Sequence, residues 1–162
     1  MKPSQHHELV EIIDRQFAAA WSMLKEAIAI FPPEEWHTAD IDYFIPARVT
    51  YHAVETVDYY CRNDLKGFTW GHRFGIDWES ASGDQLPGQG PVLEYLEETQ
   101  IHTSDWLRSL GDQALVSPDA AFRAEGYSHL DRALYVLRHI HQHLGELCSE
   151  LRQRDLVRPS WR

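Results

Sequence analysis

This sequence has few cysteines and no long apolar segment, and each absence narrows its class. The two cysteines, Cys61 and Cys148, are too few for a disulfide framework, so we expect both to be free thiols in a reducing compartment. No stretch approaches the roughly 20 apolar residues that span a membrane, and the first residues lack the apolar core of a secretory signal. These absences predict a cytoplasmic protein with no membrane partner.

Positive charge is also scarce. Twenty-five acidic residues face fifteen basic ones, which gives a formal net charge of -10 at pH 7. Proteins that bind nucleic acids use Lys and Arg to neutralise phosphates, and here these residues are concentrated only weakly, at the C-terminus. We therefore expect no nucleic-acid partner.

Length and composition fit one ordinary globular domain. The chain has 162 residues, of which 43% are hydrophobic and 25% charged, and it shows no repeat and no low-complexity tract. A chain of this length can bury about two-thirds of the surface that its unfolded form exposes. We expect residues 1–162 to form a single domain around one core.

Apolar residues that recur every three or four positions predict four long helices. Ser4 is the predicted N-cap of the first helix, and Pro32 ends it. Pro46 and Pro91 suit the first turns of the second and third helices. Gly111 is expected to end the third. The predicted ranges are residues 4–31, 46–62, 91–110 and 128–154.

Two of these helices have clear apolar stripes. In the first, the stripe runs from Leu9 to Ile28. The last helix begins with Ser128 and Asp131, which resemble an N-cap arrangement. Its stripe is unbroken: Leu130, Ala133, Leu137, Ile140, Leu144, Leu147 and Leu151. We expect this helix to pack against the others throughout.

Residues 63–90 interrupt the helical pattern. Six glycines argue against a regular element there, and a connection of this length is usually functional or a crossover. The sequence therefore predicts an all-α fold, a four-helix bundle in which this segment is the long crossover between helices 2 and 3. The aromatic residues Trp70, Phe74 and Trp78 either form a wall over a site or cap the end of the bundle.

Ten histidines are a high number for this length, and two of them share a helix face. His139 and His143 are four residues apart, so their rings project from one side of the last helix and can chelate one ion. At about 100° per residue, both lie at the edge of the leucine stripe, whereas His141 falls on the opposite flank. A third ligand must come from another helix. His52 is the candidate, because an unpaired ring in the middle of the second helix is costly to bury; a satisfied core histidine is the alternative.

The pattern around these histidines resembles the DinB/YfiT-like superfamily over nearly the whole chain. In that family a histidine of the second helix follows a lead-in with proline and tryptophan, as His52 follows FPPEEW and Pro46 here. The last helix carries a histidine, three residues, a second histidine and then usually Gly-Gln, here His139-IHQ-His143-LGE. Glu146 departs from the commoner glutamine.

The resemblance implies one divalent transition metal held by His52, His139 and His143. Three imidazoles leave open coordination positions, as in catalytic rather than structural sites. All-nitrogen ligation suits zinc, nickel, iron or copper, and the sequence does not select among them.

The resemblance further implies an enzyme that acts on a small-molecule substrate. A thiol S-transferase that uses a low-molecular-weight thiol comes first, and hydrolysis by an activated water is the nearest rival. A non-catalytic metal-binding or stress-response protein and an interaction module with incidental histidines stay open. The family's habits also suggest a homodimer. Four further residues could orient a substrate or move protons, although packing is the commoner role for such positions: Arg48, Glu55, Tyr59 and His141.

Overall fold

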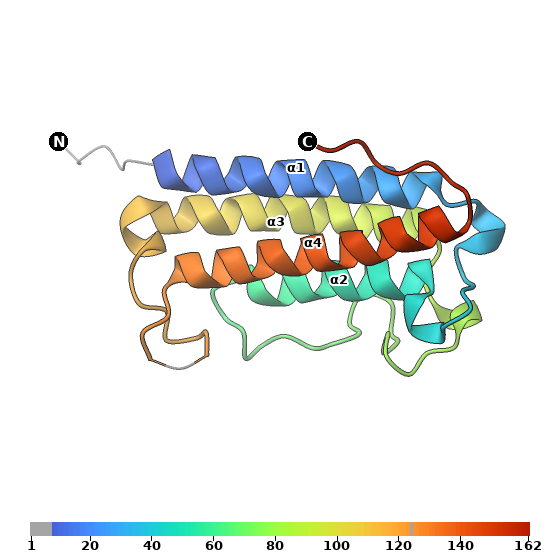
Figure 1. Ribbon diagram of the computed structural model, residues 1–162. Coiled ribbons are helices and arrows are strands. Elements are labelled where there is room, and N and C mark those ends of the chain that lie inside the picture. Colours follow the sequence, from blue (N-terminus) through green and yellow to red (C-terminus); the bar gives the residue numbers. More distant parts are fainter. Residues whose placement is uncertain (1–7, 124) are drawn as a thin grey trace.

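The computed structural model describes residues 8–123 and 125–162, and within them the chain forms four long helices and no strand (Figure 1). The helices are α1 (Glu8–Ile30), α2 (Pro46–Tyr60), α3 (Gln89–Leu115) and α4 (His129–Gln153). Three short 3₁₀ helices lie in the connections, at Pro33–Glu35, Asp42–Phe44 and Gly83–Gln85. The prediction of an all-α protein is confirmed.

The four helices lie side by side around an apolar core (Figure 1). α1 packs along α3 and α4, and α2 packs along α4 and α3. Fully buried side chains from all four helices fill the space between them, among them Phe17, Leu24, Val54, Leu96, Leu107, Ile140 and Leu147. Within the described ranges, no helix combines the length and the apolar character that crossing a bilayer requires.

Local capping explains where α4 begins. The hydroxyl of Ser128 accepts a hydrogen bond from the backbone N–H of Asp131 at 3.2 Å, and Asp131 Oδ2 accepts one from the backbone N–H of Ser128 at 2.8 Å. Each side chain thus satisfies a backbone donor that has no partner within the helix. Pro46, whose missing N–H costs nothing in a first turn, opens α2 as predicted. The predicted cap Ser4 lies outside the described residues.

The third helix is interrupted at Gly111. This residue has φ 65° and ψ 169°, which is not helical, so the helix that begins at Gln89 ends there as predicted. A short helical segment follows, and α3 includes it up to Leu115. The residue after Gly111, Asp112, accepts hydrogen bonds from the backbone N–H groups of Leu9 and Val10 at 3.1 and 3.0 Å. The continuation of α3 thus caps the first turn of α1.

The remaining differences from the predicted helices are small. Leu9 was expected in the buried stripe of α1, but it is 41% exposed because it lies in the first turn, at the end of the helix stack. The other helix ends within the described residues lie within two residues of their predicted positions. Helical periodicity and the capping residues therefore predicted most of the helix ends to within two residues.

Residues 61–88, which join α2 to α3, are largely irregular, as expected, but they are bonded firmly to α2. Three buried or half-buried contacts from one face of α2 hold the backbone of this segment: Arg48 donates to the carbonyl of Ala81 (2.7 Å), Tyr51 donates to that of Ile76 (3.2 Å), and Glu55 accepts from the N–H of Gly71 (2.6 Å). These side chains follow one another at helical spacing, so a single face of α2 fixes the segment.

Gly71 is required by this arrangement. Its φ is +79°, a conformation that favours glycine, and a Cβ at this position would lie 2.6 Å from the carbonyl oxygen of Ile76. Gly75 also has a positive φ, of +69°, but a Cβ there would meet nothing within 4 Å. Both glycines thus have the strained left-handed conformation, but only at Gly71 would a side chain also clash with the backbone.

Replacing Gly71 with alanine should destabilise the protein more than the same change at Gly75. Both variants incur the left-handed conformational cost of about 1–2 kcal/mol. Gly71→Ala should lower the free energy of unfolding by roughly a further 1–3 kcal/mol, because relieving the clash disturbs the hydrogen bond to Glu55. Urea unfolding of both variants measures the difference. Equal losses would show that the close approach to Ile76 is not a constraint.

Candidate metal centre

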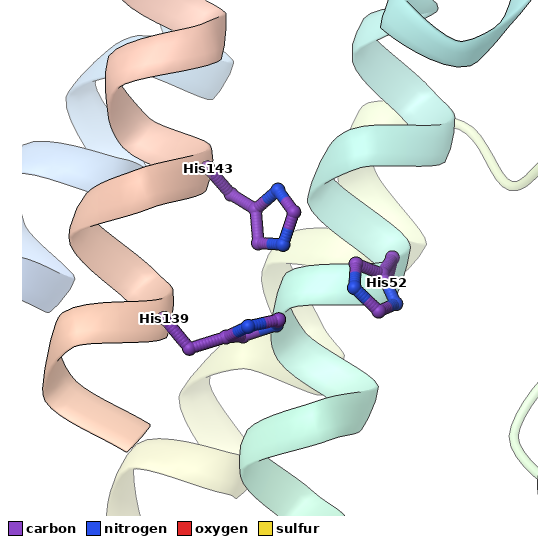
Figure 2. Close-up of side chains that lie close together, drawn as sticks. All are labelled: His52, His139 and His143. Carbon is purple, nitrogen blue, oxygen red and sulfur yellow. The ribbon is translucent and has the colours of Figure 1, made fainter. Parts of the chain in front are cut away.

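Three histidine side chains from two helices meet between α2 and α4. His52 lies in the second turn of α2, and His139 and His143 lie one turn apart on α4, with all three rings directed into the same space (Figure 2). One nitrogen of each ring lies within 4.8 Å of the other two, and the ring centroids are 4.3 to 5.0 Å apart. The structure therefore brings together the three residues that the sequence analysis predicted as metal ligands.

Two of these rings have a buried nitrogen without a partner. The Nε2 atoms of His139 and His143 are inaccessible to solvent and form no hydrogen bond with the described residues. His143 is only 1% exposed. Leaving a polar atom buried and unpaired costs about 1–3 kcal/mol. A cation at the centre of the rings would remove this cost.

The separations fit a metal ion after a small movement. Tetrahedral zinc with bonds of 2.0–2.1 Å to nitrogen separates its ligand atoms by about 3.3 Å. The ring nitrogens lie within 4.8 Å of one another, so the side chains must close slightly to bind. Because the ligands come from only two helices that pack together, side-chain rotation suffices and the backbone need not rearrange.

Glu146 orients one of the rings. Its Oε2 atom lies 2.6 Å from Nδ1 of His143, one helical turn earlier on α4. In the neutral imidazole, Nδ1 then carries the proton and donates it to the carboxylate, which leaves the lone pair of Nε2 directed at the other two histidines. A carboxylate on the outer nitrogen of a histidine ligand is the arrangement that fixes tautomer and ring orientation in metal sites.

The electrostatics of the group keep two of its rings neutral. Burial, followed by the neighbouring rings of His143 and His139, lowers the pKa of His52 to about 3. Burial and then His143 lower the pKa of His139 to about 4. Both rings are therefore unprotonated at neutral pH, the form that can coordinate a metal.

An aromatic residue of the α2–α3 connection covers His52. The ring centroids of Trp78 and His52 are 3.9 Å apart, with the planes tilted by 42°. The buried guanidinium of Arg48 donates to the backbone carbonyls of Trp78 and, at 2.7 Å, of Ala81, and it pairs with the carboxylate of Asp42 at 2.9 Å. Arg48 therefore fixes the backbone that places the indole over His52.

The other aromatic candidates lie elsewhere. Phe74 packs edge-on against Tyr51, with ring centroids 5.0 Å apart, and Trp70 is 50% exposed beside Tyr59. Among the described residues neither has a ring contact with the three histidines. Of the three residues proposed as a wall over the site, only Trp78 occupies that position.

The four residues suggested for substrate orientation also have other partners. None of them belongs to the three-histidine group: Arg48, Glu55, Tyr59 and His141. Glu55 is fully buried and accepts the N–H from the α2–α3 connection described above. Tyr59 packs on Trp70 with ring centroids 4.9 Å apart, and Nδ1 of His141 lies 2.8 Å from the carbonyl oxygen of Leu137. Ordinary structural contacts account for these side chains.

Sequence reasoning missed two residues at the site. Glu146 was noted only as a departure from a family pattern, although its position three residues after His143 predicts contact on a helix. Tyr135, four residues before His139, stacks on that ring with centroids 6.4 Å apart and planes at 21°. Helical spacing could have identified both.

The stability of the metal-free protein should fall as the pH drops below about 6.5. The unfolded chain protonates its histidines near pH 6.5, whereas His52 and His139 resist protonation until about pH 3 and about pH 4 in the folded protein. The unfolded state therefore binds more protons between pH 6.5 and 4, and the free energy of unfolding decreases through that window. Urea unfolding at a series of pH values, after removal of metal by a chelator, measures this free energy. The variant His139→Gln should show a smaller decrease with falling pH. The control His102→Gln, at an exposed position, should show the same decrease as the unmodified protein.

A comparison of the chain with models of known protein families finds no match, and a comparison with curated proteins finds none either. The candidate centre is therefore defined by its own geometry. That geometry comprises three convergent imidazoles, two unpaired Nε2 atoms and one carboxylate on an outer nitrogen.

Proposed function

We propose that this chain is a DinB/YfiT-like protein that binds one divalent transition metal through His52, His139 and His143. The observation that carries the proposal is the pair of buried, unpaired Nε2 atoms that lie beside a third imidazole. The proposed fold is a single-domain four-helix bundle with residues 61–88 in the crossover between α2 and α3. The side-by-side packing of the helices and the irregular segment support it.

The composition of the group favours an open, catalytic position. Neutral imidazoles suit zinc, nickel or iron, and among the described residues no fourth histidine, cysteine or carboxylate completes the group. When bound, the ion would act as a Lewis acid that lowers the pKa of a thiol or a water. Glu146 holds His143 in its coordinating tautomer, and Trp78 excludes solvent from one side of His52.

The reaction that we propose is the transfer of a group to a low-molecular-weight thiol. The thiol releases its proton to solvent, its sulfur forms a bond to an electrophilic carbon of the second substrate, and the leaving group departs with its electron pair. Hydrolysis uses the same centre with water as the nucleophile. A cytoplasmic location and a homodimer remain predictions from the sequence.

The non-catalytic alternative also has a structural basis. The three proposed metal ligands come from α2 and α4, so an ion would cross-link these two helices and stabilise the folded state by mass action. In that function the ion would clamp the fold and no substrate would bind. Activity, rather than metal content, separates the two functions.

The metal-loaded protein should conjugate small thiols to alkylating electrophiles at least about 100-fold faster than the metal-free protein, because general activation of a nucleophile contributes about 10²–10⁴-fold. Loss of free thiol, followed by colorimetric titration, measures the rate with zinc, nickel and iron in turn. Release of hydrolysed product without thiol would indicate a hydrolase. No turnover, together with a large fall in melting temperature on chelation, would indicate the clamp.

Each of His52→Ala, His139→Ala and His143→Ala should abolish stoichiometric metal binding, because two imidazoles alone bind weakly. His141→Ala should retain one ion per chain, since that ring lies outside the group. Elemental analysis of protein purified without an affinity tag gives the stoichiometry. Retention of metal by any of the first three variants would contradict the assigned ligands.

Glu146 provides a graded control in the same measurement. Glu146→Ala should keep the stoichiometry at saturation but weaken metal affinity by about 10–100-fold, the usual effect of removing the partner of a histidine ligand. Glu146→Gln should weaken it less, because the amide oxygen can still accept from Nδ1 of His143. Equal metal affinities for the unmodified protein, Glu146→Ala and Glu146→Gln would show that the contact between Glu146 and His143 does not support metal coordination.

A further inference from the structure

Aromatic rings continue from the three-histidine group toward the end of α2. Tyr135, one turn before His139 on α4, stacks on that ring. Tyr135 also contacts Tyr60, at the end of α2, and Phe122, in the α3–α4 connection, with ring centroids 5.2 and 5.6 Å away. Two half-buried tyrosines, backed by the buried Phe122, therefore extend an aromatic surface from one of the proposed ligands.

Two guanidinium groups lie over the ring of Tyr135. The Cζ atom of Arg123 is 4.6 Å from the ring centroid, and that of Arg138 is 5.7 Å from it. Both arginines are exposed, and within the described part of the chain neither forms an ion pair with a carboxylate. Seven other arginines form such pairs: Arg48, Arg62, Arg73, Arg108, Arg132, Arg154 and Arg162.

The lack of an ion pair at these two arginines contrasts with the charge of the whole protein. Acidic residues outnumber basic ones by 25 to 15, so most cations have an anion at hand. Arg123 and Arg138 lie over the same ring and repel each other, and a divalent ion one ring away would add to the positive potential. An anion between them would relieve this repulsion, and guanidinium groups bind carboxylates in a two-pronged geometry.

We propose that the substrate of the metal centre is an anionic thiol, whose carboxylate binds Arg123 and Arg138 while its carbon chain lies across Tyr135 and its sulfur reaches the three histidines. This inference rests on the proposed function and adds the charge and orientation of the substrate. The arginines bind and position the thiol, and they take no part in proton transfer. The carboxylate is therefore a requirement for affinity, distinct from the chemistry at sulfur.

The test compares two thiols of equal length on the zinc-loaded, full-length protein. By isothermal titration calorimetry at low salt, 6-mercaptohexanoate, whose chain is long enough to cross Tyr135, should bind about tenfold more tightly than its amide, since charge-assisted hydrogen bonds contribute at least that much. The double variant Arg123→Gln/Arg138→Gln should bind 6-mercaptohexanoate as weakly as the amide, with its affinity for the amide unchanged. The preference should also shrink as salt is added, because both arginines are exposed.

A matched control removes the same charge elsewhere. Arg152→Gln/Arg158→Gln replaces two arginines near the end of α4 and beyond it, which also lack an ion pair within the described residues, and it should keep the tenfold preference. Loss of the preference in this control, or its survival in the Arg123→Gln/Arg138→Gln protein, would overturn the anion subsite alone. If neither thiol binds the zinc-loaded protein, the thiol-dependent function fails, and the subsite with it.

Discussion

The close approach of three imidazoles in a buried space is the constraint on which the rest of this site depends. Protonation of one ring would place a charge beside the other two, and the lowered pKa values of His52 and His139 express that cost. These two rings therefore stay neutral at neutral pH, and the Nε2 atoms of His139 and His143 have no partner among the described residues. The packing of α2 against α4 thus holds together three imidazoles that do not stabilise one another, and a bound cation would remove this unfavourable contact.

One broad face of the second helix supports both the candidate site and the long connection. His52 lies one turn after Arg48 and faces the histidines of α4, and Arg48, Tyr51 and Glu55 bond the backbone of residues 61–88. The long connection is thus ordered by buried side chains rather than by regular structure of its own. One result is that Trp78, far from any helix in the sequence, has a defined position over His52.

The sequence predicted the features that depend on interactions between residues close together in the chain. Helical spacing identified the four helices and placed His139 and His143 on one face, because the period of a helix is fixed by its geometry. Periodicity does not contain the register of α2 against α4, so the choice of His52 rested on the cost of burying an unpaired ring and on the family resemblance. Which of the three candidate aromatic residues covers the site could not be predicted, since the position of Trp78 depends on a bond from Arg48, thirty residues earlier in the chain.

The short helical segment that follows Gly111 was not predicted, for the same reason. A glycine with positive φ can end a helix or interrupt one, and local sequence does not distinguish the two outcomes. Here the deciding interactions are the hydrogen bonds from α1 to Asp112. A pattern read along the chain cannot include a partner that lies about a hundred residues away.

The same pair of hydrogen bonds bears on the order in which the chain assembles. The first turn of α1 is synthesised before α3, so its backbone donors at Leu9 and Val10 gain their carboxylate only when Asp112 has been added. Until then that turn frays, and the apolar face of α1 lacks α3, against which it packs. The N-terminal turn of α1 is therefore completed only after about a hundred further residues have been translated.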